Sequence, residues 1–238
     1  MLIRLPWVGR PVRVRSRRRA KAAVPWPLAV ALLFLVPGCS LGLMASKMLL
    51  GDVKVQSQFR QATHTDLTKS NRRVLVLCSA SDTIRSAYPS VAFDILEGVI
   101  HRLKVHGIKK VVSPDAVAGW LDDHGGSFDN LQELAQHFHA DYVLHIEVLK
   151  FNCVEENSTD LLRGTSEGHV RAYHLDGPEG QQRLLEVMNS DFNSTYPPGN
   201  PVSADKKSVT NFQREYIDRI CLQLAQIFYD HPRSEEMQ

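Results

Sequence analysis

Apolar residues after position 71 fall into short runs whose spacing alternates between that of strands and that of helices. The run RRVLVLC at 72–78 is continuous and rich in Val and Leu, which indicates a strand buried on both faces. In 91–107, apolar residues recur at helical spacing before Gly107, which favours a helix. A second short strand is predicted at 108–114. Two further helices follow at 113–124 and 130–140.

The second half of the chain is predicted to be mostly strand. The segment 141–154 alternates, with Tyr142, Leu144, Ile146 and Val148 on one face. Strands at 165–176 and 183–197 follow, joined by a turn, and an amphipathic helix at 208–229 closes the pattern. The order β-α-β-α-α-β-β-β-α predicts one α/β domain of α+β character, with a mixed parallel and antiparallel sheet.

The segment before residue 47 has the pattern of an export signal. The first 21 residues carry eight basic side chains and no acid, and no charged residue occurs from 22 to 46. The apolar centre, Leu28–Val36, has nine residues and lies between prolines. A bilayer crossing needs about 20 apolar residues, so this centre favours a signal peptide over a spanning helix. Either one places the downstream domain outside the cytoplasm, since basic flanks stay inside.

The tetrapeptide VPGC at 36–39 resembles the lipobox of bacterial lipoproteins, in which Val36, Gly38 and Cys39 match and Pro37 departs from the usual pattern. This resemblance implies cleavage before Cys39 and lipidation of its thiol by diacylglycerol, with further acyl groups such as palmitate on the new amine. Several acyl chains hold a protein on a membrane almost permanently. An uncleaved amino-terminal anchor and an ordinary cleaved signal remain alternatives.

Charge and domain bounds follow from this division. The chain has 28 basic and 26 acidic residues, but only 20 basic residues remain beyond the amino-terminal arm, so nucleic acid is not expected as a partner. The expected parts are a signal segment at 1–38, a lipidated cysteine and polar tether at 39–71, the α/β domain at 72–231 and a flexible tail at 232–238. The widely spaced Cys78, Cys153 and Cys221 favour free buried thiols, with one disulfide as the alternative.

Five segments of the predicted domain form a pattern: Val74–Cys78, Val91–His106, Gly107, Val111–Val112 and Ala140–Leu149. This pattern resembles that of bacterial envelope lipoproteins with a small α/β domain, a group that includes the peptidoglycan-synthase activator, the curli secretion lipoprotein and the amino-terminal domain of the Tol-system propeller protein. The resemblance implies a binding or assembly module, not an enzyme. It transfers no binding residue to this chain.

Two clusters offer candidate metal ligands. His137, His139 and Asp141 lie within five residues, and imidazole with carboxylate suits several transition metals. The ordinary interpretation is a helix end that favours histidine. Asp122 and Asp123 precede His124 at a glycine-terminated helix end, where a polar cap is the ordinary interpretation.

Acid–base chemistry has weaker candidates. His145 and Glu147 share one strand face and could pair with His169 or Arg171 across a hairpin, which is the structural interpretation. Ser79 follows the first strand, where α/β proteins bind ligands, but no nucleophile motif surrounds it.

The sequence therefore predicts a non-enzymatic, lipid-anchored envelope protein, with no cofactor, no catalytic residue and no assigned small-molecule ligand. Its expected partners are the membrane, through lipid on Cys39, and another envelope protein. Ser40 after the cysteine favours the outer membrane over the inner, as the lipoprotein resemblance implies. An envelope hydrolase or metal-dependent enzyme using a His/Asp cluster is the alternative.

Overall fold

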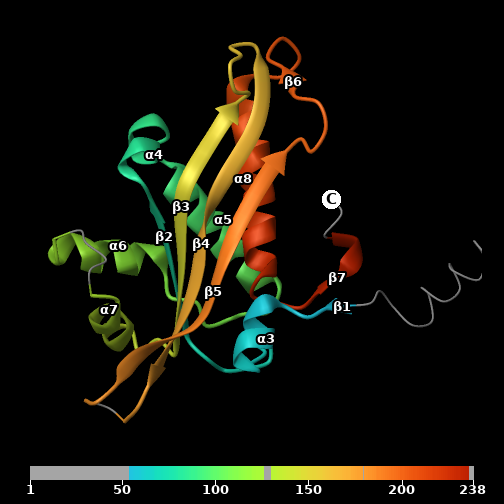
Figure 1. The fold of residues 1–238 in the computed structure, drawn as a ribbon. Helices are drawn as coiled ribbons and strands as arrows, with labels where there is room; N and C mark the ends of the chain where they lie inside the picture. The colour runs from blue at the N-terminus through green and yellow to red at the C-terminus, as the bar shows by residue number, and fades with distance from the viewer. Residues whose placement is uncertain (1–53, 126–129, 179, 236–238) are drawn as a thin grey trace, which may run out of the picture. The chain divides into compact units, whose positions relative to one another are not determined.

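The computed structural model describes residues 54–125, 130–178 and 180–235, and the statements below refer to these residues. In chain order the elements are β1 (Lys54–Val55), α3 (Gln58–Thr63), β2 (Val74–Ala80), α4 (Asp82–Ala87), α5 (Val91–Val105), α6 (Pro114–Asp123), α7 (Leu131–His137), β3 (Tyr142–Val154), β4 (Leu161–Asp176), β5 (Arg183–Tyr196), β6 (Val202–Ser203), α8 (Val209–Gln226), β7 (His231–Pro232) and a 3-10 turn at Arg233–Glu235. Figure 1 shows their arrangement.

The main sheet is mixed, as predicted. Its strands follow the order β2-β3-β4-β5, and the short β6 pairs with β4 beside them. β2 runs parallel to β3, whereas β3, β4 and β5 are antiparallel neighbours. A parallel pair needs a long crossover, which here holds the four helices from α4 to α7. The α/β class and the single folded domain are therefore confirmed.

Helices α5 and α8 cover one face of the sheet (Figure 1). The alternation predicted for β3 holds, because Leu144, Ile146 and Val148 are fully buried in the cluster that includes α5 and α8 side chains. The apolar stripe of α8 contributes Phe212 and Ile220, both fully buried. The larger of the two cores lies between this face and the helical pair.

Helices α6 and α7 cover only part of the opposite face. Leu75, Leu77 and Val143 point to this side, and Val117 and Leu134 pack against them in a separate core cluster. All five lie where β2 and β3 begin or on the helices that cover that end. Because β2 is buried from both sides, its run of consecutive apolar residues is explained.

The predicted second strand at 108–114 is reduced to one bridge. Val111 pairs in parallel with Val74, and no longer ladder forms there. Two backbone hydrogen bonds hold it: Val74 donates to Lys110 at 2.8 Å, and Val112 donates to Val74 at 2.9 Å. Pro114 then begins α6, and the remaining apolar pair is too short for a longer strand.

Residues 54–71, expected as a polar tether, are folded onto the domain. Phe59 of α3 is fully buried and its ring lies 5.1 Å from that of Tyr142, edge to face. Leu67 is also buried. The expected tail from residue 232 likewise contributes structure, since β7 pairs with β1. The domain therefore extends beyond the predicted bounds of 72 and 231 at both ends.

The three cysteines within the described residues are free thiols, as predicted. Cys78, Cys153 and Cys221 are buried, and burial raises the pKa of Cys153 and of Cys221 to about 12. They are packing residues and are poor nucleophiles at neutral pH. Cys39 and the rest of the signal segment lie outside the described residues.

Candidate functional site

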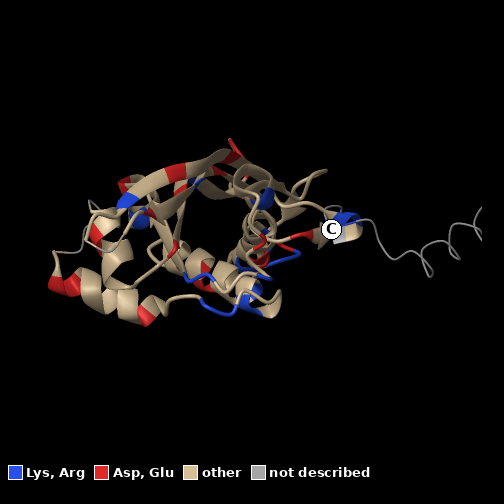
Figure 2. Ribbon diagram, turned by 90° about the horizontal axis from the view of Figure 1, so that it is seen from below, with Lys and Arg blue, Asp and Glu red and all other residues tan. Residues whose placement is uncertain are grey.

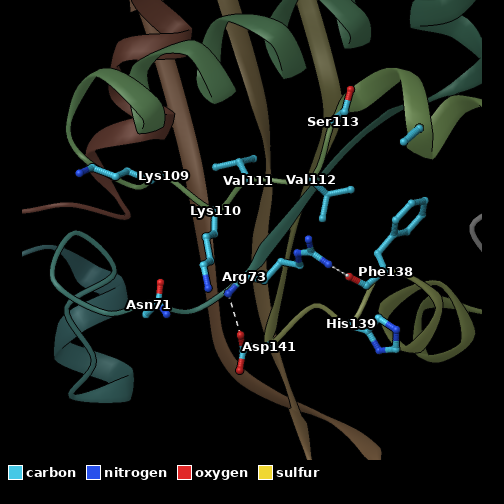
Figure 3. Close-up of a pocket in the computed structure, with 11 residues that line it drawn as sticks. Asn71, Arg73, Lys109, Lys110, Val111, Val112, Ser113, Phe138, His139 and Asp141 are labelled. Atoms are coloured by element: carbon cyan, nitrogen blue, oxygen red, sulfur yellow. Dashed lines mark hydrogen bonds between the residues drawn. The ribbon is translucent and has the colours of Figure 1, made fainter.

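A pocket of about 670 Å³ opens at the end of the sheet where β2 and β3 begin (Figure 3). Its walls come from the residues before β2, the segment between α5 and α6, and the turn between α7 and β3. The lining residues are Asn71, Arg73, Lys109, Lys110, Val111, Val112, Ser113, Ala116, Phe138, His139 and Asp141. We call it the basic pocket.

Backbone pairing brings these three segments together. The bridge between Val74 and Val111 places Lys110 beside the start of β2. Asp141 donates its backbone N–H to the carbonyl of Arg73 at 2.8 Å, which fixes the start of β3 against the same strand. Parallel neighbours begin at one end of a sheet, so residues preceding each strand meet there.

Asp141 is held entirely by the arginines before β2. One carboxylate oxygen accepts from the Arg72 guanidinium at 2.8 Å, and the other accepts from the backbone N–H of Arg73 at 2.6 Å. The hydrogen bond to Asp141 raises the pKa of Arg72. Because both carboxylate oxygens accept these hydrogen bonds, we assign Asp141 a structural role in the pocket.

Arg73 is oriented by a carbonyl group. Its Nη1 donates to the backbone oxygen of Phe138 at 3.0 Å, which ties the turn after α7 to the start of β2. Among the ion pairs of the described residues, none involves Arg73, Lys109 or Lys110. In Figure 3 the side chains of Lys110 and Arg73 turn toward the pocket interior, whereas Lys109 points outward at the rim.

The three candidate metal ligands His137, His139 and Asp141 do not form one cluster. His137 ends α7 and its ring lies 4.8 Å from that of Phe138. His139 occupies the left-handed turn before β3, with φ of 48°, and Asp141 faces the arginines. In the described ranges, no group of three or more His, Cys, Asp or Glu side chains is arranged to hold a metal ion. His139 and Asp141 instead line the basic pocket.

The second candidate cluster, Asp122, Asp123 and His124, is a polar helix end. His124 stacks on Trp120 with 3.9 Å between ring centroids, and its Nδ1 lies 2.7 Å from the Trp120 carbonyl oxygen. Asp122 and Asp123 belong to the last turn of α6. These contacts account for His124 as a capping residue of α6.

The sheet brings Ser79 and His145 together on the face that α6 and α7 leave uncovered. Ser79 Oγ and His145 Nε2 are 3.0 Å apart, across the parallel pair β2 and β3. Burial lowers the pKa of His145, and Arg171 lowers it further, against an opposing effect of Glu147. Neither Ser79 nor His145 lines the basic pocket. Their hydrogen bond joins two neighbouring strands, and we interpret it as a structural contact between β2 and β3.

Cross-strand charge pairs continue along the same open face, as the sequence predicted for Glu147. Arg171 pairs with Glu147 at 3.2 Å, and His169 lies 2.6 Å from Asp191. Lys150 and Glu167 form a third pair at 3.4 Å. Each pair contributes roughly 0.2–1 kcal/mol and gives this face a polar, solvated surface.

Sequence reasoning missed the basic residues of the pocket. The signal that could have found them is two basic pairs, Arg72-Arg73 and Lys109-Lys110, each directly before an apolar pair or run. If both runs are taken as neighbouring parallel strands, their preceding residues must lie at one end of the sheet.

Similarity to known proteins is limited to distant solved structures. No protein-family model and no curated protein sequence matches this chain. A Xanthomonas campestris protein assigned to DUF330 is 16% identical, with a TM-score of 0.43, over 66% of this chain and 83% of that one. The lipoprotein GNA1162 of Neisseria meningitidis is 15% identical, with a TM-score of 0.38, over 65% and 98%.

The LpoB C-terminal domain of Salmonella enterica is 14% identical, with a TM-score of 0.36, over 58% of this chain and 95% of that domain. The solved structures similar to this chain thus include one protein named as a lipoprotein, GNA1162, and the LpoB C-terminal domain. Among the described residues, no helix has the length and apolar content needed to cross a bilayer.

Proposed function

We propose that this chain is an exported envelope protein, anchored by lipid on Cys39, whose α/β domain binds another envelope protein and catalyses no reaction. The basic arm, the short apolar centre and the VPGC tetrapeptide support export and lipidation. The dispersal of the His/Asp candidates supports binding over catalysis, because the His137 ring packs on Phe138 while the Asp141 carboxylate is bound to Arg72.

The observation that carries the binding role is the outer edge of β5. This strand of 14 residues ends the sheet, and within the described ranges it pairs only with β4. Its residues are mostly half-buried or exposed, and the side chain of Leu185 is 47% exposed. An edge strand presents unpaired N–H and C=O groups, onto which a partner can add a strand of its own.

Photocrosslinking in intact cells tests the binding role. A photoreactive residue in place of Leu185 on β5 should give one discrete crosslinked protein, identified by mass spectrometry. The matched control replaces Phe93 on α5, which is 50% exposed and belongs to the helical layer. Identical products from both positions, or no product from Leu185 and its neighbours on β5, would contradict a partner at this edge.

Metabolic labelling with a clickable fatty acid tests the anchor. The native chain should carry the label and sediment with membranes, whereas Cys39→Ala should lose the label, because the thiol is the site of diacylglycerol transfer. Equal labelling of the native and Cys39→Ala chains would remove lipid at this residue from the proposal.

A further inference from the structure

We propose that the basic pocket is a binding site for a small phosphorylated molecule, with Arg73 and Lys110 as the residues that hold its phosphate. This site is separate from the β5 edge, and it stands or fails independently of the protein-binding role.

The charge balance of the pocket calls for an anion. Its lining holds three positive side chains, Arg73, Lys109 and Lys110, and one negative side chain, Asp141. Asp141 is already neutralised by Arg72, at 2.8 Å. The charges of Arg73 and Lys110 are thus uncompensated by a carboxylate among the described residues. Unpaired cations in a concave site focus the field and attract anions.

The Arg73 guanidinium and the backbone of Lys110 are held in place before any ligand arrives. Arg73 Nη1 is bound to the Phe138 carbonyl, which leaves its other N–H groups as donors. The Lys110 backbone is fixed by the 2.8 Å bond from Val74 to its carbonyl. Such preorganisation reduces the entropy lost on binding. A guanidinium fork beside an ammonium group matches the several oxygens of a phosphate.

The size of the pocket points to more than a bare phosphate ion. Its volume of about 670 Å³ falls in the range of sites for small organic ligands. Val112, Ala116 and Phe138 supply an apolar wall next to the cations. The Ser113 hydroxyl also lines the pocket and makes no capping hydrogen bond. A phosphate on the cations with a sugar-sized or glycerol-sized body against Phe138 uses both parts of the lining.

Two sources could supply this chemistry: a soluble sugar phosphate and the head group of a phospholipid. Both present a phosphate attached to a polyhydroxyl body. Figure 2, seen from below, shows several lysine and arginine segments in this view of the domain. The test therefore includes one probe of each kind.

Isothermal titration of the full chain in detergent tests the site with inorganic phosphate, glucose 1-phosphate and dihexanoyl-phosphatidylglycerol. Glucose and dihexanoyl-phosphatidylcholine are the probes without net negative charge. At least one phosphorylated organic probe should bind more tightly than inorganic phosphate, and affinity should fall with added salt. Preference for the sugar or for the lipid probe would support the site and identify its source.

Lys110→Gln should weaken that binding about ten-fold, since one charge-assisted hydrogen bond is lost. Within the described ranges the Lys110 side chain makes no hydrogen bond or ion pair, so this variant should keep native stability. Lys206→Gln, which removes the same charge from an exposed loop residue away from the pocket, is the matched control. Lack of binding by all three phosphate probes at millimolar concentration, or equal weakening by both substitutions, would overturn the proposal.

Discussion

At the scale of single residues, the Asp141 carboxylate ties the start of β3 to the segment before β2. Asp141 looked like a metal ligand because two histidines precede it in sequence. The structure gives both of its oxygens to Arg72 and to the Arg73 backbone instead. The histidines close to Asp141 can be read from the sequence. Its hydrogen-bond partners come from a segment almost 70 residues earlier in the chain. Pairing between distant segments is what single-sequence reading lacks.

His145 gives the clearest residue-scale prediction, concerning pH. Burial lowers its pKa in the folded state, so the unfolded state binds a proton first as the pH falls below about 6.5. Stability should therefore be full above that pH and decline below it, with a slope of at most about 1.4 kcal/mol per pH unit for one proton. Urea unfolding at pH 7.5 and pH 5 measures this.

His145→Gln keeps a group able to bond Ser79 and removes the titration. We expect this variant to be somewhat less stable at pH 7.5, yet to lose less stability on acidification than the native chain. The same pH slope in both chains would show that His145 contributes nothing to the acid sensitivity.

At the scale of elements, apolar periodicity predicted most helices and strands, because the two faces of each element meet different environments. Helix α5 and strand β3 lie within a residue or two of their predicted bounds. The strand predicted at 108–114 is reduced to a single bridge for a physical reason. Its strand character rests on Val111 and Val112 alone, while Lys109 and Lys110 before them need solvent and Pro114 after them starts a helix.

The contact between α5 and α8 depends on the absence of a side chain at Gly98. A Cβ built there would lie 2.5 Å from Cys221 Sγ and 3.1 Å from its Cβ. Gly98→Ala should therefore destabilise the fold by about 1–3 kcal/mol through overpacking, measured by chemical denaturation. Gly119→Ala in α6, where no atom lies within 4 Å, should instead stabilise by about 0.5–1 kcal/mol.

A double-mutant cycle separates the steric effect from helix propensity. Adding Cys221→Ala to Gly98→Ala removes the sulfur atom that the new methyl group meets, and the combined loss should be smaller than the two single losses added together. Strict additivity would mean that the close approach at Gly98 does not limit the packing of α5 on α8.

At the scale of the whole molecule, residues 54–71, which precede β2, contribute side chains to the core. Sequence reading placed residues 39–71 in a polar tether, because the segment has no long periodic run. Phe59 and Leu67 are isolated apolar residues in that segment, and two such residues are too few to show a helical or strand periodicity. Phe59 is buried by segments more than 80 residues away in sequence. One of its contacts is with Phe228, whose ring centroid lies 6.2 Å from that of Phe59.

This packing predicts that the Phe59 side chain stabilises the fold. Phe59→Ala should cost about 3–5 kcal/mol of unfolding free energy, because a fully buried ring leaves a cavity between Tyr142 and Phe228. Phe93→Ala, which removes an equal side chain that is half exposed, should change stability by about 0.5 kcal/mol or less. Thermal or urea unfolding of both variants measures the difference.

A chain that begins at residue 72 should be less stable still than Phe59→Ala, since it also loses the bond from the Phe59 N–H to the Ile227 carbonyl and the pairing of β1 with β7. A chain that begins at residue 52 keeps every one of these contacts and should unfold like the full chain. Equal stability of the two shortened chains would show that residues 54–71 lie on the domain without supporting it. The expected difference instead makes residues 54–71 a structural part of the domain.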